Sequence, residues 1–182
     1  MSDFWVFGYG SLMWRPGFAH SETLPARLAG VHRSLCVYSW VHRGTREQPG
    51  LVLGLDHGGA CRGLAFRVES RDRDAVVAYL REREQVTNVY REVVRPVALE
   101  GGRRVPALAY VVDRSHDQYA GRLDREAQRQ LVLSGHGQSG ANVDYVINTA
   151  KRLGELAVTD MALSALAESL VDNSGTGGGA ST

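Results

Sequence analysis

Short apolar runs, most of them bounded by Gly, Pro or a His-Arg-Gly break, dominate the chain up to about residue 112. Such runs predict β-strands, because β-branched and aromatic residues suit a pleated surface and turn residues end it. We expect six strands: Phe4–Phe7, Ser34–Val41, Leu51–Leu55, Arg62–Val68, Val89–Leu99 and Val105–Val112. Their connections do not follow a regular βαβ alternation, so the pattern indicates a mixed, curled sheet.

Helical spacing replaces this pattern in one internal segment and in the last third of the chain. The internal segment is rich in helix formers from Asp72 to Glu84, with Ser70 as a candidate N-cap. Three more helices are expected near the C-terminus: Leu123–Leu133 closing at Gly135, Val143–Leu156, and Met161–Val171 after a Thr159 cap. Strands followed by helices favour an α+β fold.

The last ten residues differ from the rest of the chain in composition. Residues 173–182 are rich in Gly, Ser and Thr, which predicts a disordered tail. The whole chain has 182 residues and is 43% hydrophobic. That length and composition suffice to bury a substantial core, so we expect one domain over 1–172.

Charge and hydropathy limit the classes of molecule that this protein is expected to bind. The 21 Lys and Arg residues nearly balance 20 Asp and Glu residues, giving a formal net charge of +1 without a basic run. This favours a small-molecule partner over nucleic acid. No apolar run is long enough for a membrane span and the N-terminus does not resemble a secretion signal, so we expect no membrane partner and a cytoplasmic protein.

The cysteines and histidines point to no redox or metal chemistry. Cys36 and Cys61 lie in apolar segments, so we expect buried free thiols. The six histidines show no short pair spacing, and no Cys-x-x-Cys or His-Glu-x-x-His motif accompanies them. We therefore expect no metal site.

The stretch from Phe4 to Trp14 carries an apolar strand directly into two glycines and a serine. Gly8, Gly10 and Ser11 would let an anionic or carbonyl-bearing group approach the backbone N–H groups. A dinucleotide fingerprint would need a third glycine where Met13 stands, and no phosphate-binding Gly-Lys-Ser/Thr loop occurs. An ordinary turn at a strand end is the remaining alternative.

A carboxylate continues the apolar stripe of the predicted internal helix, since Val77, Leu80 and Glu84 lie at i, i+3 and i+7. The local sequence Arg-Glu-Arg-Glu is also typical of a solvated helix end with ion pairs, an interpretation that suits Glu82. If Glu84 is partly desolvated instead, we expect its pKa to rise toward neutrality, as a general base that later returns its proton requires.

No protein nucleophile accompanies this candidate base. Gly137-Gln138-Ser139-Gly140-Ala141 superficially resembles a hydrolase elbow, but no histidine follows Ser139 to complete the Ser, Asp, His order. A serine hydrolase is therefore disfavoured. A base without a protein nucleophile indicates a substrate that attacks itself.

Five segments, in order and over most of the chain, resemble the ChaC family of γ-glutamylcyclotransferases. They are Phe7-Gly8-Tyr9-Gly10-Ser11-Leu12-Met13-Trp14, His42-Arg43-Gly44, Tyr79-Leu80 through Arg83-Glu84, Tyr90-Arg91, and Ser139-Gly140-x-Asn142-x-x-Tyr145. The resemblance implies an α+β fold, the γ-glutamylcyclotransferase-like mixed β-barrel with flanking helices. It also implies a lyase that cleaves glutathione to 5-oxoproline and cysteinylglycine without a cofactor.

Site residues follow from the resemblance by position. It implies that Glu84 is the catalytic general base and acid, and that Tyr90 and Tyr145 line the substrate pocket. The implied substrate-binding loop comprises Val6, Phe7, Gly8, Tyr9, Gly10 and Ser11. Two alternatives stay open: a cyclotransferase acting on another γ-glutamyl amine or peptide, and a non-catalytic regulator of cation transport.

His42 and Arg43 allow two interpretations. A guanidinium is suited to the glycine carboxylate of glutathione, because it presents a planar fork of donors. The alternative, which we favour, is a turn held by hydrogen bonds at the surface, because charged loop residues are usually solvated.

Overall fold

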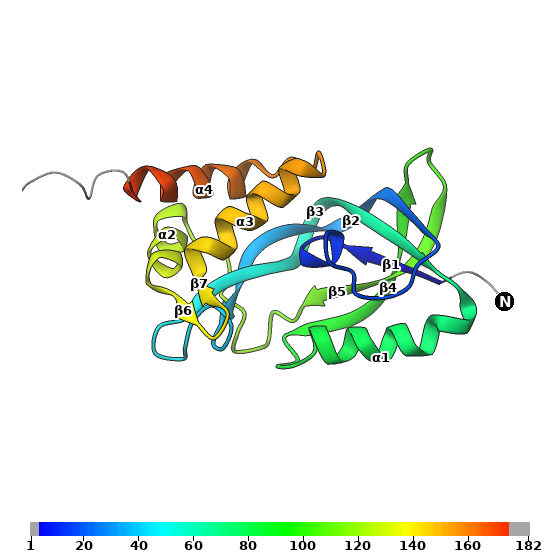
Figure 1. Cartoon of the computed structure of the whole chain (residues 1–182), viewed down its shortest axis with the longest axis horizontal. Coiled ribbons are helices and arrows are strands. Elements are labelled where there is room, and N and C mark those ends of the chain that lie inside the picture. Colours follow the sequence, from blue (N-terminus) through cyan, green and yellow to red (C-terminus); the bar gives the residue numbers. More distant parts are fainter. Residues whose placement is uncertain (1–3, 175–182) are drawn as a thin grey trace, which may run out of the picture. The chain divides into compact units, whose positions relative to one another are not determined.

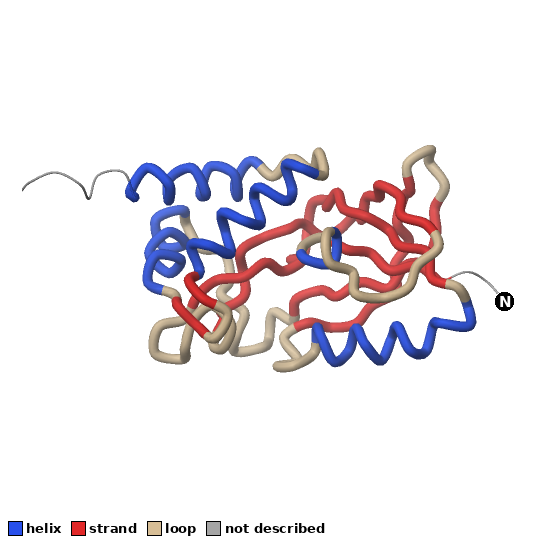
Figure 2. Tube along the Cα trace, viewed as in Figure 1, coloured by secondary structure: helices blue, strands red, loops and turns tan. Residues whose placement is uncertain are grey.

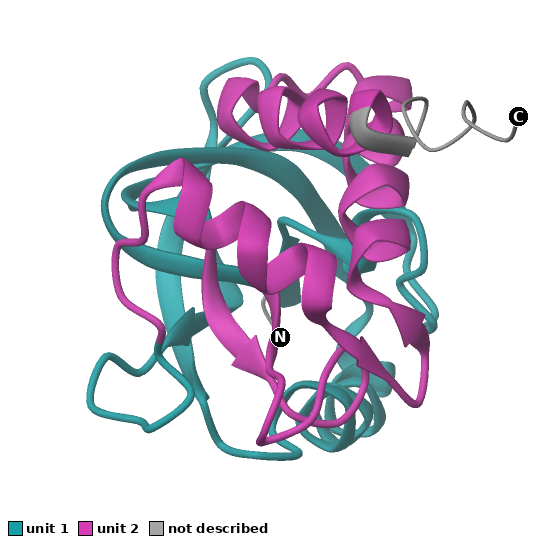
Figure 3. Ribbon diagram, turned by 90° about the vertical axis from the view of Figure 1, so that its left-hand side faces the viewer, with its two compact units in different colours: residues 1–34, 53–119 teal, residues 35–52, 120–182 magenta. Residues whose placement is uncertain are grey.

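The computed structural model describes residues 4–174, and the chain divides into two compact units (Figure 3). Unit 1 comprises the described residues up to 34 together with 53–119. Unit 2 comprises residues 35–52 and those from 120 onward. We describe each unit by itself, and the expected single domain stays a prediction.

Five strands close into a barrel in the order β1-β3-β2-β4-β5 (Figure 1). The strands are β1 (Phe4–Gly8), β2 (Glu22–Ser39), β3 (Gly50–Val68), β4 (Tyr90–Leu99) and β5 (Arg104–Val112). β1 pairs antiparallel with β3 and parallel with β5. This combination confirms the predicted mixed barrel, and most of its residues belong to unit 1, although one end each of β2 and β3 belongs to unit 2.

The helix of unit 1, α1 (Arg73–Glu84), is anchored on the barrel by its apolar face. Val76 and Leu80 are buried against side chains of β1, β3 and β5, including Phe66 and Tyr110. Two single 3-10 turns complete this unit: η1 (Ser11–Met13), after β1, and η2 (Ser70–Asp72), before α1. Figure 2 shows η1 as one turn followed by the loop that leads into β2.

Unit 2 contains three helices that pack on one another: α2 (Arg125–Ser134), α3 (Asn142–Glu155) and α4 (Met161–Ser174). A two-stranded ladder of β6 (His136–Gly137) and β7 (Gly140–Ala141) joins α2 to α3. The buried Asn142 side chain accepts from Leu51 N at 2.7 Å and donates to Leu51 O at 2.8 Å. This pair of bonds fixes the start of α3 on the start of β3.

Three strand predictions were wrong in length. β2 begins at Glu22, twelve residues before the predicted Ser34, because Ala26 and Leu28 alternate inward although Pro25 and Gly30 interrupt the apolar pattern. The predicted strands Leu51–Leu55 and Arg62–Val68 are one strand, β3. Gly58 and Gly59 both have positive φ, so they bend this strand instead of ending it.

The predicted helices exist, but two of their caps differ. Ser70 begins η2 and does not cap α1, whose N-cap position is held by Asp72. α4 is capped by Asp160 instead of Thr159, since Leu163 N donates to the Asp160 carboxylate at 3.0 Å. α4 also extends to Ser174, into the predicted tail, and residues 175–182 lie outside the described residues.

Cys36 and Cys61 are buried free thiols, as predicted. Within residues 4–174, no group of three or more His, Cys, Asp or Glu side chains is placed to hold a metal ion. No helix in this range is long and apolar enough to span a membrane.

Candidate functional site

The glycine loop begins at the end of β1, where Gly8 is the last residue paired with β3. Gly8 lies opposite Leu64, and a Cβ atom on Gly8 would come within 3.1 Å of Leu12 Cβ and 3.2 Å of Phe66 Cε2. A Cβ atom on Gly63 would overlap the Gly8 carbonyl oxygen. Gly63 therefore has no room for a side chain and Gly8 has little, and the close contact fixes where the loop leaves the barrel.

After β1 the chain enters η1 through Gly10. Met13 N donates to Gly10 O at 2.9 Å, which closes the turn. The first N–H groups of a helical turn have no acceptor within it, so the amides of Ser11 and Leu12 are not used by η1. The expected loop therefore presents backbone donors where a substrate carbonyl or carboxylate could accept them.

Arg33 bonds to the loop at Tyr9, and Tyr9 and Tyr90 share an acceptor on β3. Arg33 Nε donates to Tyr9 O at 2.7 Å. The hydroxyls of Tyr90 and Tyr9 both donate to Leu53 O, at 2.7 and 3.5 Å. Tyr90 therefore shares an acceptor with a loop residue, and its predicted role in lining the substrate pocket stays a prediction.

Tyr145 lies on α3 in unit 2, and its described contact is with Arg43, whose guanidinium carbon lies 5.6 Å from the ring centroid. Arg43 also donates through Nη1 to Ala141 O at 3.1 Å. These contacts support the interpretation of His42-Arg43-Gly44 as a turn held by hydrogen bonds. The role of Tyr145 in the substrate pocket stays a prediction.

Glu84 is the last residue of α1 and its side chain is only 17% exposed. Burial raises the pKa of this carboxyl above its ordinary value, although the nearby Arg83 cation acts in the opposite direction. The solvated helix end suggested by the local sequence is therefore wrong for Glu84 and holds for the exposed Glu82. A partly desolvated carboxylate of this kind can accept and return a proton.

A second carboxylate in the same unit has the opposite electrostatics. Arg81 binds Glu92 through two hydrogen bonds of 2.9 and 2.8 Å, and this pairing holds the pKa of Glu92 below its ordinary value. Tyr110 also donates to Glu92, at 3.1 Å. Burial raises the pKa of the Tyr110 hydroxyl, and the charges of Glu92 and Glu84 raise it further. Glu92 is thus fixed as an anion, and Glu84 is the carboxylate suited to proton transfer.

Ser139 has a histidine neighbour that the chain order did not indicate. His42 Nδ1 lies 2.9 Å from Ser139 Oγ, and Ser139 N donates to His42 O. Among the described residues, no carboxylate bonds to His42 to complete a triad. This geometry is that of two turns joined side by side, so the absence of a serine nucleophile stays our interpretation.

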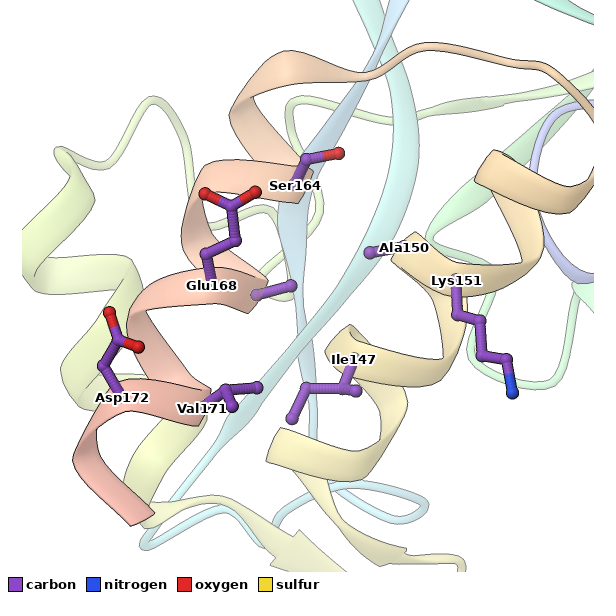
Figure 4. A pocket seen from close by; sticks show the side chains of 8 residues that line it. Ile147, Ala150, Lys151, Ser164, Glu168, Val171 and Asp172 are labelled. Atoms are coloured by element: carbon purple, nitrogen blue, oxygen red, sulfur yellow. The ribbon is translucent and has the colours of Figure 1, made fainter. Parts of the chain in front are cut away.

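A groove lies between α3 and α4 (Figure 4). Ile147 and Val171 point toward one another across it, and Lys151, Glu168 and Asp172 add charge. It lies entirely in unit 2 and includes none of the predicted site residues. We therefore assign the candidate site to the glycine loop and Glu84.

Comparison with known proteins identifies the family. The sequence profile of the ChaC-like proteins matches residues 4–173. The chain belongs to the ChaC-like family. This confirms the family resemblance of the five segments.

ChaC-like relatives of known activity cover most of the chain. The glutathione-specific γ-glutamylcyclotransferase of Escherichia coli K12 is 32% identical over 162 residues, which are 89% of this chain and 70% of that protein. The human glutathione-specific γ-glutamylcyclotransferase 1 is 35% identical over 150 residues, covering 80% and 68% of the two chains.

The crystal structure of a yeast γ-glutamyl cyclotransferase specific to glutathione has the same fold. It matches this ChaC-like chain with a TM-score of 0.83, at 22% identity, and the match covers 94% of this chain and 97% of the yeast chain. The predicted α+β fold with a mixed barrel and flanking helices is thus confirmed.

Three residues near the site of this ChaC-like protein were missed by the sequence analysis. Arg83 was taken with the solvated helix end, yet its side chain is only 21% exposed. Tyr110 was counted as one residue of an apolar strand. Glu92 was counted with the strand residues. The i, i+4 spacing of Tyr79 and Arg83, whose side chains form a 3.0 Å hydrogen bond, was the available signal for Arg83.

Proposed function

We propose that this protein is a γ-glutamylcyclotransferase that cleaves glutathione to 5-oxoproline and cysteinylglycine. In the proposed reaction the α-amine of the glutamyl group attacks its own γ-carbonyl carbon and closes a five-membered ring. The bond from that carbon to the cysteinyl nitrogen then breaks. Atoms balance without water, because the two protons lost by the α-ammonium nitrogen are gained by the departing nitrogen.

Glu84 is the proposed carrier of one of these protons. It takes one proton from the α-ammonium group, which makes the nitrogen nucleophilic, and protonates the leaving nitrogen. The second proton, which the ring nitrogen loses as it becomes the lactam N–H, passes to the same leaving nitrogen, so cysteinylglycine departs with an ammonium group. The observation that carries the proposal is the burial of this carboxyl at the end of α1, which raises its pKa toward the range where both transfers are efficient. Glu92 is a poorer candidate, because Arg81 holds it as an anion.

The glycine loop is the proposed binding site for the γ-glutamyl group. Backbone amides from Gly8 to Ser11 would donate to the γ-carbonyl oxygen, where negative charge develops during attack, or to the α-carboxylate. Val6 and Phe7 belong to β1 and are buried, so in this proposal they support the loop from the barrel. Tyr9 and Tyr90 would form one wall through their shared acceptor, Leu53 O.

Positioning supplies much of the proposed rate enhancement. Because the nucleophile and the electrophile belong to one substrate, the site needs to hold a folded γ-glutamyl chain with the two atoms in contact. Well-oriented intramolecular reactions gain about 7–11 kcal/mol in this way. The scheme uses one carboxylate and backbone donors and requires no cofactor.

The glutathione specificity of the bacterial and human relatives supports this choice of substrate. We also propose a cytoplasmic location, where thiols stay reduced, and the two buried free cysteines are compatible with it.

The test is to incubate the purified protein with reduced glutathione and quantify both products. We expect 5-oxoproline and cysteinylglycine in equal amounts. A parallel panel of γ-glutamyl amino acids and γ-glutamylamines tests the substrate. Turnover of a panel member with none of glutathione would keep the reaction and reject the substrate, and no turnover at all would reject the proposal.

A further inference from the structure

Arg83 contacts both parts of the candidate site with one guanidinium group. Its Nε lies 3.4 Å from Glu84 Oε1, and its Nη2 donates to Ser11 Oγ at 2.8 Å. Its Nη1 donates to Arg15 O at 2.6 Å and to Pro16 O at 3.3 Å. The Arg83 side chain thus links Glu84, at the end of α1, to Ser11 at the end of the glycine loop and to the backbone of Arg15 and Pro16.

Tyr79 extends this contact by one helical turn. Its hydroxyl accepts from Arg83 Nη1 at 3.0 Å, and its ring packs edge-on against Phe18 at a centroid distance of 6.4 Å. Gly17 lies over the tyrosine hydroxyl with φ of +74°, and a Cβ atom there would overlap Tyr79. The chain from Arg15 to Phe18 is therefore packed on the face of α1 that carries Arg83.

We propose that Arg83 is a positioning residue, which acts through Glu84 and Ser11 to hold the general base and the substrate-binding loop at a fixed separation. This inference rests on the proposed function for its catalytic consequence. The contacts themselves are independent of the substrate. Arg83 is assigned no contact with the substrate and no share in proton transfer.

The geometry requires arginine in particular. A guanidinium has donors in a planar fork and can bind several acceptors at fixed angles, whereas a lysine ammonium is a point charge on a flexible stem. In Arg83 the three nitrogens each have a different partner set: Glu84, the Ser11 hydroxyl, and the backbone carbonyls with Tyr79. Lysine at this position would keep the charge and lose the simultaneous contacts.

The charge of Arg83 acts separately from its geometry. Arg83 on the same helix is the charged group that shifts the pKa of Glu84, the charge of Glu84 acts in turn on Tyr110 of β5, and Glu92 on β4 is paired with Arg81. The Arg83 cation lowers the pKa of Glu84 against the effect of burial. Removing the charge should therefore raise that pKa further, and replacing Arg by Lys should leave it near the wild-type value.

Three variants of the full chain separate these effects: Arg83→Lys, Arg83→Met and Arg73→Met. Arg73 is the first residue of α1, about 16 Å along the helix axis from Glu84, and serves as the matched control for loss of one cation from the same helix. We expect kcat for glutathione to fall about tenfold or more in both Arg83 variants, because small displacements of reacting groups are costly. Arg73→Met should retain the wild-type kcat.

The pH profile separates charge from position. In Arg83→Met the acidic limb of kcat/KM should move to higher pH, because Glu84 then ionises at higher pH. In Arg83→Lys the limb should stay in place while kcat is reduced. Wild-type kcat in Arg83→Lys, or an unmoved limb in Arg83→Met, would overturn the proposal, as would an equal loss of activity in Arg73→Met.

Hydrogen exchange gives a readout that needs neither turnover nor the Arg83→Met variant. The amides of Met13 and Arg15 bond to the carbonyls of Gly10 and Ser11, and they should exchange faster in Arg83→Lys than in wild type or Arg73→Met. Unchanged exchange would overturn the loop contact. If wild type fails to cleave glutathione, the proposed function fails while exchange still tests Arg83; if wild type is active and Arg83→Lys matches it, only the Arg83 proposal fails.

Discussion

Glu92 and Tyr110 face each other directly across β4 and β5, and the tyrosine hydroxyl donates to the carboxylate at 3.1 Å. Arg81 completes the pairing of Glu92, so this carboxylate is held as an anion. Glu84, whose charge also acts on Tyr110, has a pKa shifted the other way by burial. The pKa values of Glu84 and Glu92 are thus shifted in opposite directions within one unit. This difference distinguishes the candidate base, Glu84, from the carboxylate that stays ionised, Glu92.

The acidic limb of the pH profile of kcat/KM should reflect the ionisation of Glu84. The proposed base works only when ionised, so kcat/KM should fall as pH drops through its pKa. Because burial raises that pKa, the limb should lie above the ordinary carboxyl value of 4.5. Initial rates of 5-oxoproline formation across a pH series measure it. A profile that stays flat down to pH 4.5 would contradict the assignment.

Glu84→Gln should raise the melting temperature at neutral pH. A carboxyl whose pKa is higher in the folded than in the unfolded chain adds stability below its unfolded pKa, and this contribution is lost as pH rises through the folded pKa. At neutral pH the folded protein therefore holds a buried charge that Gln does not carry. Scanning calorimetry should show the gain at neutral pH and its disappearance below a pH of about 4.

Glu82→Gln is the control for this measurement, because Glu82 is exposed on the same helix. It should show no such pH-dependent gain. A lower melting temperature for Glu84→Gln than for wild type at neutral pH would mean that Arg83 stabilises the carboxylate by more than burial destabilises it.

Gly63→Ala should destabilise the protein and reduce activity together. Its Cβ atom would overlap the Gly8 carbonyl oxygen, which is backbone and can move only with the loop. Overpacking of this kind costs about 1–3 kcal/mol. Gly154→Ala is the matched control: no atom lies within 4 Å of its Cβ position in α3, so it should stabilise by about 0.5–1 kcal/mol. Urea unfolding of both variants measures the difference, and equal stabilities would refute the close contact.

Asn142→Ala should lower the free energy of unfolding by about 1–3 kcal/mol, because it leaves the buried N–H and C=O of Leu51 without their side-chain partner. Lys151→Ala, at an exposed position of the same helix, should change it by less than about 0.5 kcal/mol. Urea unfolding again measures both. Similar values for the two variants would show that the Asn142 bonds contribute little.

The family resemblance implied the barrel, and the positions of its strands were predictable from local apolar runs. Strand length was not, since Gly58 and Gly59 have the composition of a turn but bend β3 without interrupting it. Whether a glycine pair ends or bends a strand depends on the neighbouring strand. That information is absent from the local sequence.

One residue of the candidate site was conspicuous in the sequence, and its catalytic role stays a prediction. Glu84 stood out because a carboxylate occupied an apolar stripe. Arg83 did not, because its partners Ser11 and Arg15 are about 70 residues away in sequence. The contact between Glu92 and Tyr110 depends on the register of β4 against β5, which the strand pattern alone does not fix.

The central claim is that Glu84 carries the proton in cyclotransfer. The most direct test compares the rate of 5-oxoproline formation from glutathione at saturation for wild type, Glu84→Gln and Glu82→Gln. The account predicts a loss of about 10²–10⁴-fold in kcat for Glu84→Gln, since the shape is kept and proton transfer is removed. It predicts wild-type kcat for Glu82→Gln. A folded Glu84→Gln variant with wild-type turnover would contradict the account.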